Sequence, residues 1–76
     1  TSAIFVQAGA FTVPDNAHRL QARLASLGPS AVASAEVNGK RFYRVRIGPL
    51  ATVDAADAML GRVVNAGYQE AKITVQ

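Results

Sequence analysis

Residues 32–47 have the sequence VASAEVNGKRFYRVRI, in which two alternating runs flank the dipeptide Asn38-Gly39. Asn-Gly is typical of a type I′ turn, because both central residues of that turn need a positive φ. Pairing outward from the turn places Ala35 opposite Phe42. The stretch therefore predicts a β-hairpin whose side chains alternate between the two faces of a sheet.

The segments on either side of this turn repeat one another. Phe5–Gly28 aligns without a gap with Arg44–Gly67. Each copy has the order strand, glycine turn, helix and glycine stop, so a repeated supersecondary unit explains the pattern. The identical pairs are Val6 and Val45, Gly9 and Gly48, Asp15 and Asp54, Ala17 and Ala56, Arg23 and Arg62, and Gly28 and Gly67.

Two amphipathic helices are expected, one in each copy of the repeat. Residues 14–27 start with Pro14, which suits a first helical position because its missing N–H would be unpaired there anyway. Apolar residues then recur at helical spacing up to Gly28, the expected C-terminal stop. Residues 53–66 have the same spacing, and Thr52 before them is an expected N-cap.

Alternating residues in segments 3–10 and 70–76 predict a first and a last strand, so the element order is βαββαβ. The expected fold class is α+β and ferredoxin-like, with a four-stranded antiparallel sheet in the order 4-1-3-2 and both helices on one face. The strand residues expected to face the helices are Ile4, Val6, Ala8, Val32, Tyr43, Val45, Ile47, Ala71, Ile73 and Val75.

The same alternation leaves the other face of the sheet without a cover. Its expected residues are Phe5, Gln7, Gly9, Ala33, Ala35, Phe42, Arg44, Arg46, Lys72 and Thr74. Two aromatic side chains, an amide and several cations thus converge on one exposed surface. Such a mixed apolar and cationic patch indicates a binding site.

Length and composition limit what this chain can do. Its 76 residues suffice for one domain with a thin core, and we expect residues 1–76 to be a single domain cut from a longer protein. The chain has no cysteine, which excludes a disulfide framework and any thiolate metal site. Its apolar runs are too short to insert into a membrane. The formal net charge is a modest +3, to which a cluster at residues 40–46 contributes most.

Two motifs resemble the SPOR (sporulation-related repeat) domain of bacterial cell-division proteins. The first is Gln7-Ala8-Gly9-Ala10-Phe11, and the second is Tyr43-Arg44-Val45-Arg46-Ile47-Gly48-Pro49. The resemblance covers nearly the whole chain, and within the family it is most similar to the C-terminal SPOR domains of septal lytic transglycosylases.

The resemblance implies a non-catalytic module that binds peptidoglycan through the open sheet face. SPOR domains recognise denuded glycan, meaning GlcNAc-MurNAc strands whose stem peptides have been removed, and so direct their parent proteins to the division septum. It implies a periplasmic or cell-envelope location, a parent that is a lipoprotein of the outer membrane, no cofactor and no metal. A monomer is the simplest expectation.

The family's glutamine on the first strand corresponds to Gln7. Two positions depart from the family pattern: Ala10 stands where a small polar residue is common, and Lys72 stands where some members carry an aromatic residue. The segment from Thr12 to Asn16 borders the open face. The expected ligand-binding residues are Phe5, Gln7, Gly9, Ala10, Thr12, Asn16, Phe42, Arg44, Arg46, Lys72 and Thr74.

The chemistry of the ligand fits these residue types. Aromatic side chains pack on the apolar face of a sugar ring, and an amide both donates to and accepts from its hydroxyl and N-acetyl groups. Removing the stem peptide frees the lactyl carboxylate of muramic acid, which Arg44, Arg46 or Lys72 could pair with. We therefore expect this carboxylate, together with steric exclusion of the peptide, to set the preference for denuded strands.

Three other function classes compete with this interpretation. An RNA-recognition module shares the fold, but here only Phe5 and Phe42 remain to stack bases, so no nucleic-acid partner is expected. An enzyme would have to use His18, the only histidine, or the helix-start acids Asp54 and Asp57, and no catalytic set surrounds them. A protein-binding role could use the second strand, which lies at an edge of the sheet.

Overall fold

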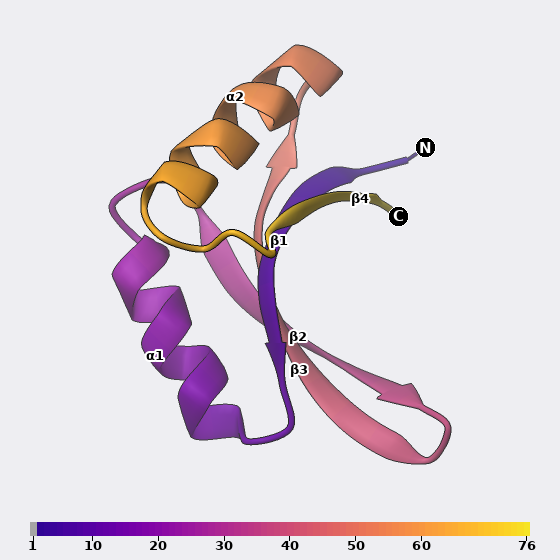
Figure 1. Ribbon diagram of the computed structural model, residues 1–76. Helices are drawn as coiled ribbons and strands as arrows, with labels where there is room; N and C mark the ends of the chain where they lie inside the picture. The colour runs from indigo at the N-terminus through magenta and orange to yellow at the C-terminus, as the bar shows by residue number, and fades with distance from the viewer. Residues whose placement is uncertain (1) are drawn as a thin grey trace.

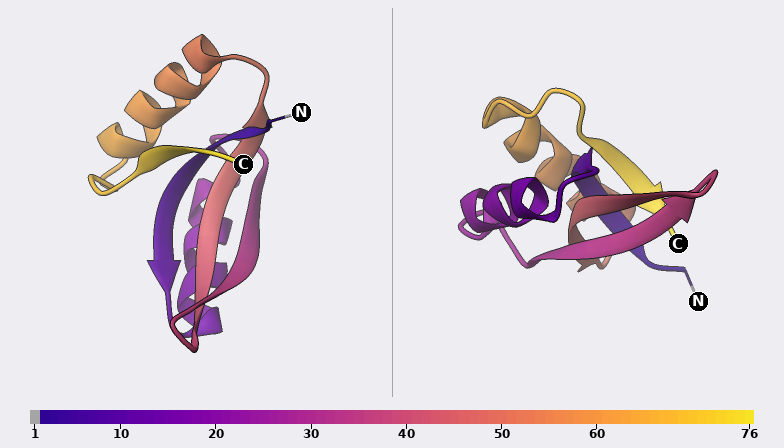
Figure 2. Two further views of the ribbon diagram at one scale, coloured as in Figure 1. Left: turned by 90° about the vertical axis from the view of Figure 1, so that its right-hand side faces the viewer. Right: turned by 90° about the horizontal axis from the view of Figure 1, so that it is seen from below.

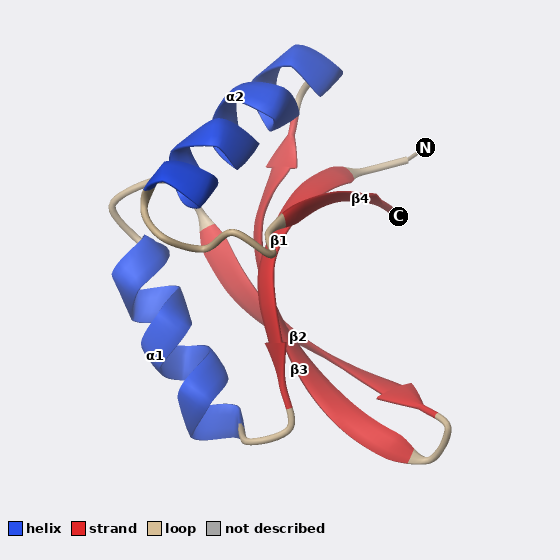
Figure 3. Cartoon of the chain, in the orientation of Figure 1, coloured by secondary structure: helices blue, strands red, loops and turns tan. Residues whose placement is uncertain are grey.

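The computed structural model describes residues 2–76 and confirms the predicted element order. Figure 1 traces the chain, and Figure 3 shows the same view coloured by secondary structure. The elements are β1 (Ile4–Phe11), α1 (Pro14–Leu24), β2 (Ser30–Val37), β3 (Lys40–Leu50), α2 (Val53–Asn65) and β4 (Lys72–Val75).

The four strands form one antiparallel sheet in the order β2-β3-β1-β4, which is the predicted order named from the other edge. Both helices cover the same face, and the sheet curves away from them so that its other face is concave (Figures 1 and 2). The two ends of the chain meet at one edge, where Ala3 and Gln76 exchange backbone hydrogen bonds of 2.7 and 2.8 Å. Neither helix in residues 2–76 is long and apolar enough to cross a membrane.

Local sequence signals explain most of the element ends. Asn38 and Gly39 have φ angles of 51° and 77°, as the type I′ turn requires, and the hairpin has the predicted register. The hydroxyl oxygen of Thr52 accepts a hydrogen bond of 3.0 Å from the backbone N–H of Ala55, which confirms it as the N-cap of α2. Gly67 has a φ of 110° directly after that helix.

The core lies between the helices and the convex side of the sheet. Both predicted helical stripes are buried, with Ala17, Leu20 and Leu24 from α1. The equivalent residues of α2 are Ala56, Met59 and Val63. They pack against buried strand residues Val6, Ala8, Val45 and Ile47, and a partly buried margin surrounds these: Phe11, Leu27, Val32, Tyr43, Leu50, Leu60, Tyr68, Ala71 and Ile73.

Three sequence predictions about this layer are wrong. Helix α1 ends at Leu24, before the predicted stop at Gly28. Gly28 instead packs closely on the core, since a Cβ there would lie 3.1 Å from Met59 Cε at the end of a flexible side chain. Val75 was expected in the core but is 66% exposed, because β4 is short and neither helix covers its last residues. Gly9 was expected on the open face but faces the helices.

A β-bulge in β1 explains the position of Gly9. The β1–β3 register pairs Gln7 with Arg46 and then Gly9 with Val45, so β1 carries one extra residue at this point. The bulge reverses the alternation beyond Ala8. A Cβ on Gly9 would lie 3.1 Å from Leu20 Cδ2 on α1, which places this glycine against the core.

Candidate functional site

The concave face is built from rows of residues that lie side by side across the sheet. The longest row crosses all four strands and consists of Ala31, Arg46, Gln7 and Lys72. The next rows are Ala33, Arg44 and Ala10, and then Ala35 and Phe42, while Phe5 pairs with Thr74 on the far side. The sheet therefore brings Gln7 between two cations and places both phenylalanines on one surface.

Arg46 is held in place by its neighbours on this face. Its guanidinium carbon lies 4.2 Å from the centroid of the Phe5 ring, a cation–π contact. The same guanidinium donates a hydrogen bond to the side-chain oxygen of Gln76 at the end of the chain. Arg46 therefore contacts both Phe5 and Gln76, and these two contacts within the domain fix the position of its guanidinium.

Arg44 is different, because its neighbours leave it free. Its cross-strand partners are Ala33 on β2 and Ala10 on β1, and neither has a polar side chain. Among residues 2–76 the single ion pair joins Arg41 and Glu36 near the hairpin turn, and no side-chain hydrogen bond involves Arg44. A guanidinium between two alanines can approach a flat anionic ligand without first breaking an internal contact.

The concave face contains a hollow of about 310 Å³, the concave-face hollow. Residues from β2, β3 and the end of β4 line it: Ala33, Ser34, Ala35, Arg44, Arg46, Thr74, Val75 and Gln76. The Thr74 hydroxyl is buried at its margin and has no hydrogen-bond partner in the described part of the chain. Alanine side chains give the hollow its depth, and the two arginines give it positive charge.

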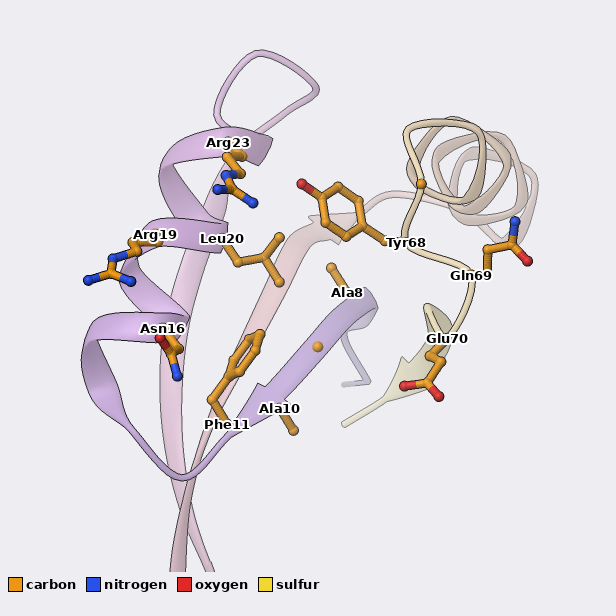
Figure 4. A pocket seen from close by; sticks show the side chains of 12 residues that line it. Ala8, Ala10, Phe11, Asn16, Arg19, Leu20, Arg23, Tyr68, Gln69 and Glu70 are labelled. Carbon is orange, nitrogen blue, oxygen red and sulfur yellow. The ribbon is translucent and has the colours of Figure 1, made fainter.

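A second hollow of about 480 Å³ lies at the side of the sheet, and we call it the edge groove. It is lined by Ala8–Phe11 at the end of β1, by Asn16, Arg19, Leu20 and Arg23 on α1, and by residues 67–70 between α2 and β4. Figure 4 shows Arg23 and the hydroxyl of Tyr68 pointing toward one another across it. It is separate from the concave-face hollow, since the two share no lining residue.

The chain matches the model of the SPOR domain family over residues 1–74. It belongs to the SPOR family. Two solved structures have the same fold and similar sequences. The SPOR domain of RlpA from Pseudomonas aeruginosa is 31% identical, with a TM-score of 0.77, over 93% of this chain and 96% of that one.

The second structure is the peptidoglycan binding domain of the cell wall lytic enzyme CwlC from B. subtilis. It is 30% identical, with a TM-score of 0.76, over 100% of this chain and 91% of that one. A comparison with curated protein sequences finds no match. SPOR domains are binding domains that occur in proteins of the cell envelope and of cell division.

The structure of this SPOR domain divides the predicted ligand-binding residues between two surfaces. The concave face carries Phe5, Gln7, Ala10, Phe42, Arg44, Arg46, Lys72 and Thr74. Gly9 and Asn16 line the edge groove, which Ala10 also borders. Thr12 lies in the exposed bend between β1 and α1 and lines neither hollow. Gly9, Asn16 and Thr12 therefore lie apart from the concave-face hollow.

Sequence reasoning missed the contribution of Gln76 and Ser34 to the concave-face hollow. The Gln76 side chain accepts a hydrogen bond from Arg46, which lies 30 positions earlier in the sequence, and alternation along a strand does not predict this contact. His18 lies exposed on α1, where its ring contacts only the side chain of Gln21 at 3.5 Å. Within residues 2–76 no group of three or more potential metal ligands comes together.

Proposed function

We propose that this SPOR domain binds denuded peptidoglycan glycan strands on its concave face and thereby directs its parent protein to the division septum. The observation that carries the proposal is the unpaired guanidinium of Arg44, set between Ala33 and Ala10 beside the concave-face hollow. The peptidoglycan binding domain of CwlC, with the same fold over the whole chain, supports the ligand class.

Each part of a glycan strand has a complementary group on this face. Phe5 and Phe42 are partly exposed and offer flat apolar surfaces for the C–H face of a pyranose ring. Gln7, flanked by Arg46 and Lys72, provides one acceptor and two donor hydrogens for hydroxyl and N-acetyl groups. The contacts with neutral sugar would therefore come from Phe5 and Gln7 on β1 and from Phe42 on β3, and those with anions from the arginines of β3.

Arg44 is the residue that we assign to the lactyl carboxylate of a denuded muramic acid. This carboxylate exists only after the amide bond to the stem peptide has been cleaved, so a cation that binds it distinguishes denuded from intact strands. A charge-assisted pair is about twice as strong as a neutral hydrogen bond. Arg46 is less available for the same role, because it already contacts Phe5 and Gln76.

The test is a pull-down with purified sacculi, with and without amidase treatment, using the wild-type chain, Gln7→Ala and Arg44→Ala. We expect amidase treatment to increase wild-type binding, and Arg44→Ala to remove about a tenfold affinity advantage for treated sacculi, the equivalent of ~1.4 kcal/mol. Gln7→Ala should weaken binding to both preparations, because sugar groups are present in each.

The matched control is Arg62→Ala, which removes the same charge from an exposed position on α2, away from the concave face. If Arg62→Ala and Arg44→Ala lose binding equally, only net charge matters and the assignment of Arg44 is wrong. If the wild type binds neither preparation, the glycan proposal fails, and single-stranded RNA becomes the next ligand to try.

Septal targeting needs a separate measurement, because it depends on the cell as well as on the domain. A fluorescent fusion of residues 1–76 should concentrate at division sites in cells with active amidases and spread along the envelope when the amidases are deleted. A fusion that remains at the septum without amidases would show that denuded glycan is not what recruits it.

A further inference from the structure

The sheet has an unfilled position beside the second half of β1. Strand β4 pairs only with the first half, and its register ends where Gln7 meets Lys72. Along Ala8–Phe11, β1 pairs with β3 on one side, and no strand in residues 2–76 occupies the other. An unpaired strand edge is a template for another extended chain, since its backbone groups lack the partners that a ladder provides.

This free edge forms one wall of the edge groove, and cations stand on the opposite wall. Arg19 and Arg23 are exposed on α1. Within the described residues neither makes an ion pair or a side-chain hydrogen bond, not even with Asp15 one turn earlier on the helix. Two like charges four residues apart weaken a helix slightly. Asp15 on α1 and Glu70 in the groove lining are the nearby acids, but neither forms an ion pair with Arg19 or Arg23 in the described residues. An external anion can therefore pair with these two cations.

We propose that the edge groove binds an extended acidic peptide segment of a partner protein, which adds to β1 as a fifth strand. Its backbone would pair along Ala8–Phe11, and one carboxylate would face Arg23, which points into the groove (Figure 4). The exposed Arg19 side chain points away from β1 in the same view, and it would turn toward the groove to meet a second carboxylate. The Tyr68 hydroxyl, opposite Arg23, supplies a further donor (Figure 4). This is β-strand addition, in which main-chain pairing provides affinity and side-chain contacts provide specificity.

The spacing of the two arginines defines the sequence of the segment. Four helical residues rise about 6 Å, and alternate residues of a strand lie about 6.6 Å apart on one face. Carboxylates at positions i and i+2 of the segment therefore match Arg19 and Arg23, whereas carboxylates on adjacent residues would point to opposite faces. The small side chains of Ala8 and Ala10, with Gly9 between them, leave room for a backbone to approach.

The experiment is an NMR titration of the ¹⁵N-labelled chain with the capped peptide Thr-Glu-Val-Glu-Val-Thr. We expect binding in the submillimolar to millimolar range, with the largest amide shifts at Ala8–Phe11 and Arg23. The isomer Thr-Glu-Glu-Val-Val-Thr has the same composition and charge but the wrong alternation, and it should bind several-fold more weakly. A peptide with Gln in place of Glu should bind more weakly still.

Variants separate this site from the glycan site. Arg19→Ala and Arg23→Ala should each weaken the peptide about threefold and together about tenfold, as expected for exposed ion pairs, with Arg62→Ala as the control. Arg44→Ala should leave peptide binding unchanged, and the double groove variant should bind amidase-treated sacculi like the wild type. The proposal therefore stands or falls independently of the proposed function.

Three results would overturn it. No shift at Ala8–Phe11 at millimolar peptide would show that the edge does not accept a strand. Equal affinity for the two isomers would show that only net charge attracts the peptide. Shifts of the same amides by a denuded glycan, with no shift by the peptide, would assign the edge groove to the saccharide.

Discussion

The two βα halves of this SPOR domain are built on the same core but present different chemistry. Their sequences align from Phe5 and from Arg44 onward, and the buried positions of α1 coincide with those of α2. The corresponding pairs are Ala17 and Ala56, Leu20 and Met59, and Leu24 and Val63. The repeat therefore preserves the core positions of the two helices. At these positions the size of the apolar side chain differs between the halves, but its place along the helix does not.

On the concave face the two halves differ in kind. Phe5 and Gln7 of the first half align with Arg44 and Arg46 of the second, and Gln7 and Arg46 are also direct neighbours in the sheet. One half therefore supplies a ring and an amide, and the other supplies two cations. The two halves have thus diverged on the face that we propose as the binding site, next to core positions that packing has kept alike.

Truncating a buried side chain of one helix removes part of that half's contribution to the shared core. Leu24→Ala truncates a side chain with no exposed surface, and we expect it to lower the free energy of unfolding by about 2–5 kcal/mol. Val63→Ala at the aligned position should cost less, because fewer methyl groups are lost. Urea denaturation followed by circular dichroism measures both, and Val53→Ala, at a side chain 63% exposed, is the control.

Both truncations should reduce the stability of the whole chain in a single transition, because the two helices pack on one sheet. Two separate transitions after Leu24→Ala would show that the halves fold independently, which would contradict a shared core.

The layered fold was predictable because each of its signals is local. Asn38-Gly39 determines the hairpin register, Thr52 marks the start of α2, and the stripes of both helices follow from a 3.6-residue period. Strand order then follows from handedness and connection rules. None of these predictions depends on contacts between residues that are far apart in the sequence.

The site was less predictable because the missing information is not local. The bulge after Gln7 changes the face of Gly9. A glycine within a strand is a known signal for a bulge, but simple alternation does not take it into account. Likewise, the contact between Gln76 and Arg46 joins residues 30 positions apart in the sequence. Arg46 contacts Phe5 and Gln76, whereas Arg44 lies between two alanines. Simple alternation places both arginines on the same face and cannot predict this difference.

The aligned glycines Gly9 on β1 and Gly48 on β3 differ in how well they would tolerate a side chain. Gly48 has a φ of 139°, and a Cβ there would lie 2.9 Å from the carbonyl oxygen of Ile4. Gly48→Ala should therefore lower stability by about 1–3 kcal/mol. Gly9→Ala should cost less, because its nearest contacts are side-chain atoms of Leu20 and Phe11, which can move.

Thermal unfolding of the two alanine variants under identical conditions checks this order. A larger loss of stability in Gly9→Ala than in Gly48→Ala would contradict the prediction. The bulge at Gly9, and not the positive φ of Gly48 within β3, would then mark the less tolerant of the two glycine positions.

The smallest expected effect concerns the two helix starts. Thr52 caps α2 with its hydroxyl, whereas Val13 at the same position of α1 has no capping group, although its backbone is extended as a cap requires. Thr52→Ala should lower stability by about 1 kcal/mol. Val13→Ser should raise it by a similar or smaller amount, because Val13 is 48% exposed and little apolar burial is lost.

The double variant Val13→Ser with Thr52→Ala tests whether the effects of the two helix caps on stability are independent. The helix starts belong to different halves and share no partner, so the two changes should add and return stability close to that of the wild type. A double variant as unstable as Thr52→Ala alone would mean that α1 gains nothing from a cap. In that case Pro14 and the packing of Ala17 and Leu20 already determine where the first helix begins.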